Sequence, residues 1–180
     1  MSTGATESVQ QTISRQVDWR PFFTSEYSYT VDSQGRLQFP PSWRPPSGQL
    51  ELVAVWLRHK KSGKEHLQLL TVEAFSQLSQ PKSDGTLSPE TEEAHAKRLA
   101  IQHAFARRSA QVELDKVGRL NLPKKLLERA GIGAEALFVG CGDRIEVWSE
   151  AAFEEALALE SDLIPEDLRV PPLTRGEKGK

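Results

Sequence analysis

The stretch VDSQGRLQFP, from Val31 to Pro40, returns in altered form as LDKVGRLNLP, from Leu114 to Pro123. Both copies keep an Asp, a Gly-Arg pair, a Leu and a closing Pro at the same spacing. An internal repeat of this kind indicates that one supersecondary unit has been used twice, with each copy helping to bury the other. The repeat therefore predicts a fold built from two similar units.

Each copy of the repeat predicts a strand, a tight turn and a second strand. In the second copy, apolar and polar residues alternate over 112–114 and again over 120–122, the period of a half-buried strand. Gly118, like Gly35 in the first copy, supplies the positive φ that a tight hairpin turn requires. The same glycine, placed beside an Arg, would also let the backbone come close to a phosphate.

A short helix, a second hairpin and a longer helix are expected after this turn. In the second copy, Pro123 is placed where the helix KKLLERA begins and Gly131 where it ends. The segment FVGCGDRIEVW predicts a hairpin turning at 140–143. Ser149 is a good N-cap for the helix that follows, and Thr71 has the matching place in the first copy.

The two copies differ in length, and a linking segment joins them. In the first copy, residues 40–48 (PPSWRPPSG) hold four prolines and allow at most one helical turn. Residues 58–66 (RHKKSGKEH) predict a longer, basic hairpin. The linking segment SPETEEAH predicts a helix with Ser88 as N-cap and Pro89 at its first position, running to about Arg107.

The composition is that of an ordinary globular protein. The chain has 180 residues, of which 38% are hydrophobic and 27% charged, and its net charge is -2. The longest apolar stretch, residues 50–57, is too short to cross a bilayer, and the polar N-terminus has no signal-peptide pattern. The single cysteine, Cys141, excludes an internal disulfide. We therefore expect a cytoplasmic protein without a membrane partner.

Charge is unevenly distributed along the chain. Between His95 and Ala130 there are nine Lys or Arg residues against three acids, whereas residues 143–167 are strongly acidic. A chain with a slightly negative total charge can thus carry one basic face, which a nucleic-acid partner would need. Ordinary solvated surfaces are the simpler interpretation of any one of these clusters taken alone.

Four segments together resemble a known family. They are FTSEYSYTVDSQGR (23–36), RLAIQHAF (98–105), VELDKVGRLNLP (112–123) and FVGCGDRIEVWSEAAFEE (138–155). A single D-x-x-G-R unit of this kind is similar to the swapped-hairpin unit of the SpoVT/AbrB superfamily. Two such units in one chain resemble the MraZ family of bacterial DNA-binding transcriptional regulators.

The resemblance implies an α+β fold of tandem swapped-hairpin SpoVT/AbrB-like half-barrels, joined by a helix and related by a pseudo-two-fold axis. Neither half should be stable alone, because four short strands and a helix bury little apolar surface. The expected segments are a polar N-terminal extension (1–22), the first unit (23–79), a loop and linking helix (80–111), the second unit (112–157), and a helix end with a flexible C-terminal tail (158–180).

The function implied by the resemblance is sequence-specific DNA binding through the two D-x-x-G-R turns. The family regulates the division and cell-wall gene cluster by binding promoter repeats, and its subunits assemble into homo-oligomeric rings, so double-stranded promoter DNA and other copies of the chain are the expected partners. The location would be the cytoplasm, on the nucleoid. The predicted DNA-binding residues are Arg36 and Arg119, supported by Ser33, Gln34, Lys116 and Lys124.

Arginine suits this task because its planar, permanently charged fork matches the O6 and N7 acceptors of guanine in the major groove. A structural interpretation of the same residues stays open. Asp32 and Arg36, like Asp115 and Arg119, could pair across their own turns and stabilise them. In either case the Asp and the Gly of each turn (Asp32, Gly35, Asp115, Gly118) have structural roles, with the carboxylate accepting backbone N–H groups.

Other classes of function have less support. An oligomeric protein-interaction module, an antitoxin-like scaffold without specific DNA binding, is the main alternative, with the acidic 154–168 segment and the basic tail as contact regions. No acid–base pair or phosphate loop indicates an enzyme, a cofactor or a small-molecule substrate. Cys141 lies in a predicted turn with no base near it in the sequence, and the four histidines lack the spacing of metal ligands.

Overall fold

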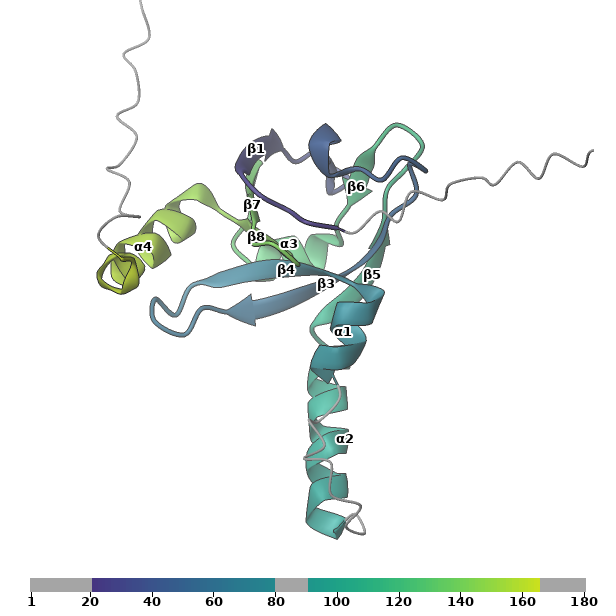
Figure 1. Cartoon of the computed structure of the whole chain (residues 1–180), viewed down its shortest axis with the longest axis vertical. Helices are drawn as coiled ribbons and strands as arrows, with labels where there is room; N and C mark the ends of the chain where they lie inside the picture. Colours follow the sequence, from purple (N-terminus) through teal and green to yellow (C-terminus); the bar gives the residue numbers. More distant parts are fainter. Residues whose placement is uncertain (1–20, 80–90, 166–180) are drawn as a thin grey trace, which may run out of the picture.

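The computed structural model describes residues 21–79 and 91–165. Two sheets and several helices make up this part of the chain (Figure 1). Three segments lie outside the described residues: 1–20, which includes Trp19, 80–90, and the tail 166–180. The elements are β1 (Glu26–Thr30), β2 (Arg36–Gln38), the 3-10 turn η1 (Pro41–Trp43), β3 (Glu51–Arg58), β4 (Glu65–Thr71), α1 (Val72–Ser79), α2 (Glu92–Ala106), β5 (Ser109–Glu113), β6 (Arg119–Asn121), α3 (Lys124–Arg129), β7 (Glu135–Gly140), β8 (Ile145–Trp148), α4 (Glu150–Glu160) and η2 (Ser161–Leu163).

This order confirms the predicted series of elements in both copies. Strand, turn, strand, short helix, hairpin and longer helix follow one another twice, and α2 stands between the two series. The protein is therefore of the mixed α+β class. In the first copy the short helix is reduced to the 3-10 turn η1, as the four surrounding prolines predicted.

Strands of the two copies interleave in the sheets. The larger sheet has the order β1-β7-β8-β4-β3-β5, and β2 pairs with β6 in a separate ribbon. Thus β1 of the first copy pairs with β7 of the second, and β5 of the second copy pairs with β3 of the first, all antiparallel. Within a single copy, only β3 with β4 and β7 with β8 form pairs in the larger sheet.

The core lies between the β2–β6 ribbon and the larger sheet. Leu37 and Leu120, opposite each other in the ribbon, are buried, as are Phe39 and Leu122 just after it. Burial of four such side chains contributes roughly 1.5–3 kcal/mol each, and it fixes the ribbon on the body of the protein. The aromatic rings of Phe23, Phe39, Trp43 and Phe138 pack edge to face in the same cluster.

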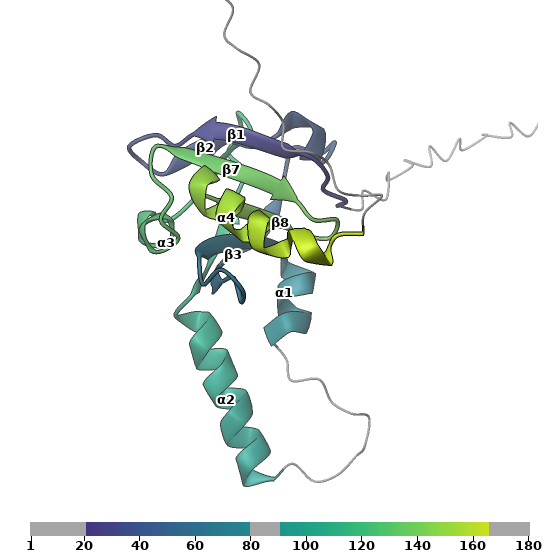
Figure 2. The ribbon, with the colours of Figure 1, turned by 90° about the vertical axis from the view of Figure 1, so that its left-hand side faces the viewer.

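The linking helix α2 projects away from the sheets (Figures 1 and 2). Its N-cap is Thr91, whose side chain accepts a hydrogen bond from the backbone N–H of Ala94. The prediction of Ser88 as N-cap was therefore wrong; Ser88 and Pro89 lie outside the described residues. Among the described helices, none is long and apolar enough to cross a membrane.

The long basic hairpin between β3 and β4 holds the last helix, α4. Nε2 of His59 lies 2.9 Å from a carboxylate oxygen of Glu160, and Nζ of Lys64 lies 2.8 Å from one of Glu155. Ser149 caps α4, and the hydroxyl of Thr71 accepts a hydrogen bond from the third residue of α1, so both predicted caps are confirmed.

Candidate nucleic-acid interface

The two repeated turns adopt the same backbone conformation. In the first, the N–H of Asp32 donates to the carbonyl of Arg36, and the N–H of Gly35 donates back to the carbonyl of Asp32. Asp115, Gly118 and Arg119 repeat this pattern in the second turn. The φ angles are +82° at Gly35 and +77° at Gly118, as expected for three-residue hairpin loops that end in a left-handed glycine.

The Asp of each turn binds both the backbone and its own Arg. One carboxylate oxygen of Asp32 accepts the backbone N–H groups of Gln34 and Arg36, and the other accepts Nε–H of Arg36 at 2.8 Å. Asp115 does the same in the second turn, again with 2.8 Å between its Oδ2 and Nε of Arg119. The pairing across each turn is therefore present.

These hydrogen bonds affect the acidity of the two carboxyl groups. The backbone N–H of Arg36 is the main cause that lowers the pKa of Asp32 below its ordinary value, and the backbone N–H of Arg119 lowers the pKa of Asp115 in the same way. The side-chain bond to the guanidinium adds to both shifts. Both carboxylates are thus charged at neutral pH and hold one edge of each guanidinium in place.

Both Arg side chains project from the outward face of the β2–β6 ribbon. Arg36 is opposite Asn121, and Gln38 is opposite Arg119, while the buried pair Leu37–Leu120 lies between them. Since successive side chains in a strand point to opposite faces, these four polar side chains share the face that points away from the core. Arg119 is on the strand next to Arg36 and is displaced from it by two residues along the ribbon. Strand spacing and rise therefore put the Cα atoms of the two Arg residues ~8 Å apart.

Gln38 and Asn121 were not among the residues predicted from the sequence. Each follows a turn Arg by two positions, so the alternation of a strand places it on the same face as that Arg. This alternation was the signal that could have identified them. Asn and Gln amides are the side chains that pair with adenine in the major groove. The outward face of the ribbon thus carries four groups suited to base edges.

The turn glycines have the structural role predicted for them, with positive φ angles, and the protein packs closely against both. Both are buried, and they face the protein. A Cβ at Gly35 would collide with the carbonyl oxygen of Leu122, and one at Gly118 would collide with the guanidinium of Arg44. Protein atoms thus occupy the side on which a Cβ would stand, so close packing within the protein also requires glycine at these two positions.

Each turn is fixed by the strand of the other copy. The backbone N–H of Phe39 donates to the carbonyl of Gly118 at 3.1 Å, and the N–H of Leu122 donates to the carbonyl of Gly35 at 2.9 Å. These reciprocal bonds join the two turns and the ribbon into one rigid unit. Preorganisation of this kind reduces the entropy lost on binding.

The other predicted contact residues have distinct positions. Ser33 and Gln34 lie at the exposed tip of the first turn and Lys116 at the tip of the second. Lys124 is exposed at the start of α3, and Leu127 of that helix lies against Gly35, so Lys124 belongs to the surroundings of the first turn.

Arg44 adds a positive charge that the sequence did not suggest. Its Nε and Nη2 donate to the carbonyl of Phe39 at 3.1 and 2.6 Å, and its guanidinium lies against Gly118 in the second turn. In the second copy, the position that corresponds to Arg44 holds the apolar Leu127, which lies beside Gly35 of the first turn. The two turns therefore differ in local charge although their backbones agree.

Cys141 is in the turn between β7 and β8, as predicted. Burial raises the pKa of its thiol to about 11, so the thiol stays protonated and weakly nucleophilic at neutral pH.

Comparison with known proteins assigns the chain to a family. The family model described as "MraZ protein, putative antitoxin-like" matches residues 105–169. The transcriptional regulator MraZ of Ruegeria pomeroyi is 31% identical over 159 residues, which cover 81% of this chain and 90% of that protein. The chain belongs to the MraZ family.

Two further relatives of the same name span most of the chain. The transcriptional regulator MraZ of Cytophaga hutchinsonii is 31% identical over 140 residues, which are 78% of this chain and 87% of that protein. The transcriptional regulator MraZ of Leuconostoc citreum is 29% identical over 136 residues, or 76% and 87% of the two chains. Matches of 136 residues or more are too long to fall within one copy and the linking segment, so the family assignment rests on residues of both copies.

Proposed function

We propose that this protein is a sequence-specific DNA-binding transcriptional regulator that reads promoter DNA with the outward face of its β2–β6 ribbon. The observation that carries the proposal is the pair of identical Asp-anchored Arg turns on that face. Arg36 and Arg119 are the residues that contact bases, with Ser33, Gln34, Lys116 and Lys124 in support. The relatives from Ruegeria pomeroyi and Cytophaga hutchinsonii are named transcriptional regulators, which agrees with this role.

The pairing with Asp is compatible with contact to DNA. In each turn, Nε–H of the Arg donates to the Asp carboxylate. Within residues 21–79 and 91–165, the two Nη atoms of Arg36 and of Arg119 have no hydrogen-bond partner. About 40% of each Arg side chain is exposed. The free edge of the fork can donate to O6 and N7 of guanine while the Asp fixes its direction, and a two-stranded ribbon is narrow enough for the major groove.

A single Arg–guanine pair contributes only about 1–3 kcal/mol of discrimination against the wrong base, so one subunit alone distinguishes promoter DNA from other sequences only weakly. Repetition solves this, because linked sites bind with a high effective concentration. A homo-oligomeric ring on the nucleoid that faces spaced repeats upstream of the division and cell-wall gene cluster is the proposed assembly. Within each subunit we propose two SpoVT/AbrB-like swapped-hairpin units, at 23–79 and 112–157, related by a pseudo-two-fold axis; the exchanged pairs β1–β7 and β5–β3 support it.

The experiment is a fluorescence-anisotropy titration with the protein's own upstream promoter duplex and a scrambled duplex of equal length. The wild type is compared with the Arg36→Ala/Arg119→Ala double variant. Loss of two guanine contacts per subunit should lower the preference for promoter over scramble by about tenfold or more. The Lys60→Ala/Lys61→Ala variant, which removes the same charge from the exposed tip of the β3–β4 hairpin, should keep the preference.

Circular dichroism melting of each variant checks that the fold is intact. A folded double variant that keeps the promoter preference would show that the Arg turns serve only structure. Loss of the preference in the Lys control as well would indicate a general charge effect and contradict the assignment of Arg36 and Arg119.

An oligomeric protein-interaction module is the second candidate, and one surface favours it. The acidic helix α4 and the following η2 leave Leu157, Leu159 and Leu163 exposed by 40, 53 and 66%. Apolar side chains set among acids suit a protein partner. Wild-type protein that binds promoter and scramble equally weakly at every salt concentration would favour this candidate over the regulator.

A further inference from the structure

Four basic side chains meet where the end of α2 approaches α3. They are Arg107 and Arg108 at the end of α2 and Lys125 and Arg129 on α3, called here the α2–α3 basic cluster. Nη1 of Arg129 donates to the backbone carbonyl of Arg107 at 3.3 Å and so joins the two helices. Two members precede β5 in the sequence and the other two follow β6, so it is the fold that brings the four side chains together.

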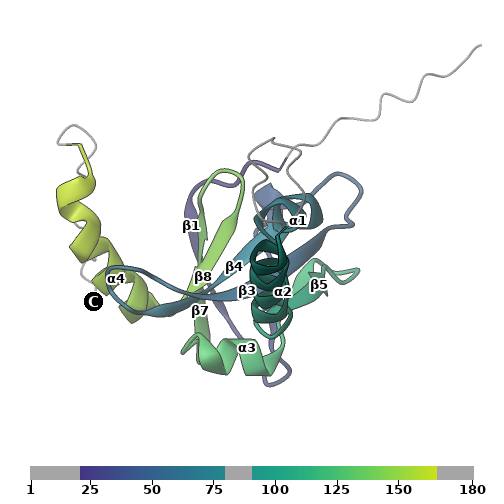
Figure 3. The same cartoon turned by 90° about the horizontal axis from the view of Figure 1, so that it is seen from below.

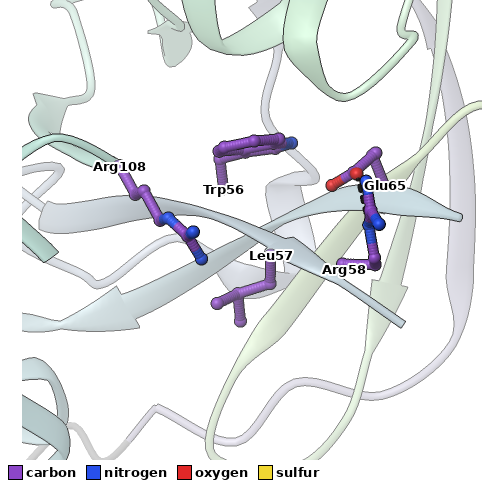
Figure 4. Close-up of a pocket in the computed structure, with 5 residues that line it drawn as sticks. All are labelled: Trp56, Leu57, Arg58, Glu65 and Arg108. Atoms are coloured by element: carbon purple, nitrogen blue, oxygen red, sulfur yellow. Dashed lines mark hydrogen bonds and ion pairs between the residues drawn. The ribbon is translucent and has the colours of Figure 1, made fainter. Parts of the chain in front are cut away.

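Two cavities open beside this cluster. One, of 440 Å³, is lined by Arg107, Lys125 and Arg129 together with the hydroxyl-bearing Ser109, and the residues lining it include no acid. The other, of 330 Å³, contains the indole of Trp56, with Arg108 on one side and the paired Arg58 and Glu65 on the other (Figure 4).

Trp56 helps to hold the cluster in place. The guanidinium carbons of Arg108 and Arg129 lie 5.3 and 5.1 Å from the centre of its ring, within the range of cation–π attraction. The indole thereby brings two cations together that would otherwise separate. The guanidinium groups of Arg108 and Arg129, each of which lines one of the cavities, are therefore positioned before any ligand arrives.

Within the described part of the chain, the positive charges of this cluster have no carboxylate partner, and none of its four members forms an ion pair there. The one acid in the lining, Glu65, is bound to Arg58 at 2.7 Å. Like charges held together raise the free energy of the folded protein, and an anion in the cavity would relieve this repulsion.

Helix α3 connects the cluster to the first Arg turn. Cδ1 of Leu127 lies 3.5 Å from the position of a Cβ on Gly35, so the turn rests on the helix. The loop after β1 lies beside helix α3 in Figures 2 and 3, and in Figure 2 the end of α2 lies at the same edge. An anion bound by the cluster would thus lie along the edge of the molecule that carries Arg36.

We propose that the α2–α3 basic cluster binds phosphate groups of the DNA backbone beside the bases that Arg36 contacts. This inference rests on the proposed function and adds a second contact of a different kind. Phosphate contacts position a protein on the duplex and carry no sequence information directly. The cluster should therefore contribute affinity on any sequence, whereas the ribbon contributes preference.

The test measures the salt dependence of binding to the promoter and to the scrambled duplex. Arg107→Gln/Lys125→Gln removes two exposed charges that line the larger cavity, and it leaves Arg129 and Trp56 in place. The matched control is Lys60→Gln/Lys61→Gln on the β3–β4 hairpin. Because the slope of log K against log salt is about -0.9 per phosphate neutralised, losing two contacts per subunit should make the slope shallower by about 1.8 for each subunit bound to the duplex.

We expect this change on both duplexes, with an equal loss of affinity on each and no change in the control. A slope equal to that of the wild type overturns the inference, even if the wild type prefers its promoter. A slope that changes equally in the control also overturns it, because the effect is then not specific to the cluster. A wild type without promoter preference, but with a shallower slope in the cluster variant, refutes the proposed reading of bases and leaves the phosphate site supported.

Discussion

Asp32 and Asp115 act as both turn residues and orienting groups. Each carboxylate divides its oxygens, one for backbone N–H groups and one for Nε of the Arg in its own turn. The Arg side chain loses rotamer freedom in the free protein, so less of that entropy is lost on contact with DNA. The structural role of the Asp–Arg pair and the proposed contact with DNA thus support each other.

The lowered pKa values of Asp32 and Asp115 predict how stability responds to acid. A carboxyl group whose pKa is lower in the folded state stabilises the fold above its unfolded pKa of about 3.9. This contribution is lost as the pH falls through the folded-state pKa. The Asp32→Asn/Asp115→Asn variant should be less stable than the wild type at pH 7, and the difference should shrink below pH about 4. Urea unfolding followed at several pH values measures it.

Asp162→Asn is the matched control for this experiment, because Asp162 is exposed in η2 and belongs to neither turn. Its stability difference from the wild type should be small at every pH. If the turn variant and the wild type kept a constant difference from pH 7 to 2, the carboxylates would not be the groups responsible.

Cys141 should react slowly in the folded protein. With a pKa raised to about 11 by burial, its thiolate fraction at pH 8 is on the order of a hundredfold lower than that of an unfolded thiol with a pKa of about 8.5. Alkylation by iodoacetamide, followed by mass spectrometry in buffer and in guanidinium chloride, should show this ratio. A native rate that levels off near pH 9 would contradict the assigned pKa.

At the scale of elements, the two turns depend on glycine for two separate reasons. Gly35 needs its φ of +82° and also meets the backbone of Leu122, whereas Gly63 has a φ of +68° and open space around it. Gly63→Ala should cost about 1–2 kcal/mol for the left-handed backbone alone. Gly35→Ala should cost about 1–3 kcal/mol more, because a carbonyl oxygen of the ribbon must move. Urea unfolding of both variants gives the difference.

Gly118→Ala further separates the cost of the positive φ from the cost of a Cβ that collides with its neighbours. Its Cβ would meet the side chain of Arg44, which can swing aside, so the cost should fall between those of Gly63→Ala and Gly35→Ala. Equal costs at all three positions would mean that only the φ angle matters and that the ribbon does not press on the turns.

The local elements could be predicted from the sequence because their signals are local. Each of these elements depends on residues that are close together in the chain. They are the two Asp-Arg turns, the helix caps at Thr71 and Ser149, and the short 3-10 turn η1 after Pro40. The expected cap of α2 was Ser88, but Thr91 has that role, because its side chain accepts the backbone N–H of Ala94.

The site itself was only partly predictable. Strand alternation could have placed Gln38 on the face of Arg36 and Asn121 on the face of Arg119. No local pattern specifies that β2 pairs with β6 across the two copies and so brings these four side chains together. Arg44 reaches the turn of the other copy for the same reason. The α2–α3 basic cluster similarly requires knowledge of where α2 ends relative to α3.

At the scale of the whole molecule, each copy lacks most of its strand partners without the other. A separated first copy would keep only the β3–β4 pairing, and a separated second copy only β7–β8. An isolated two-stranded hairpin is marginally stable in water. We therefore expect residues 1–85 and 86–180, produced as separate chains, to show little cooperative unfolding by circular dichroism.

Mixing the two fragments should restore a cooperative transition, because β1–β7, β3–β5, β2–β6 and β4–β8 can then form between them. Cooperative unfolding of either fragment alone would contradict the view that the two copies complete one core.

The central claim is that Arg36 and Arg119 donate hydrogen bonds to guanine. The most direct measurement is a double-mutant cycle between these residues and guanines of the promoter, each replaced in turn by 7-deazaguanine, which lacks the N7 acceptor. We expect the replacement to weaken binding of the wild type by about 1 kcal/mol or more at the contacted guanines. The same replacement should have no effect on the Arg36→Ala/Arg119→Ala variant. Equal penalties in both proteins at every guanine would contradict the claim.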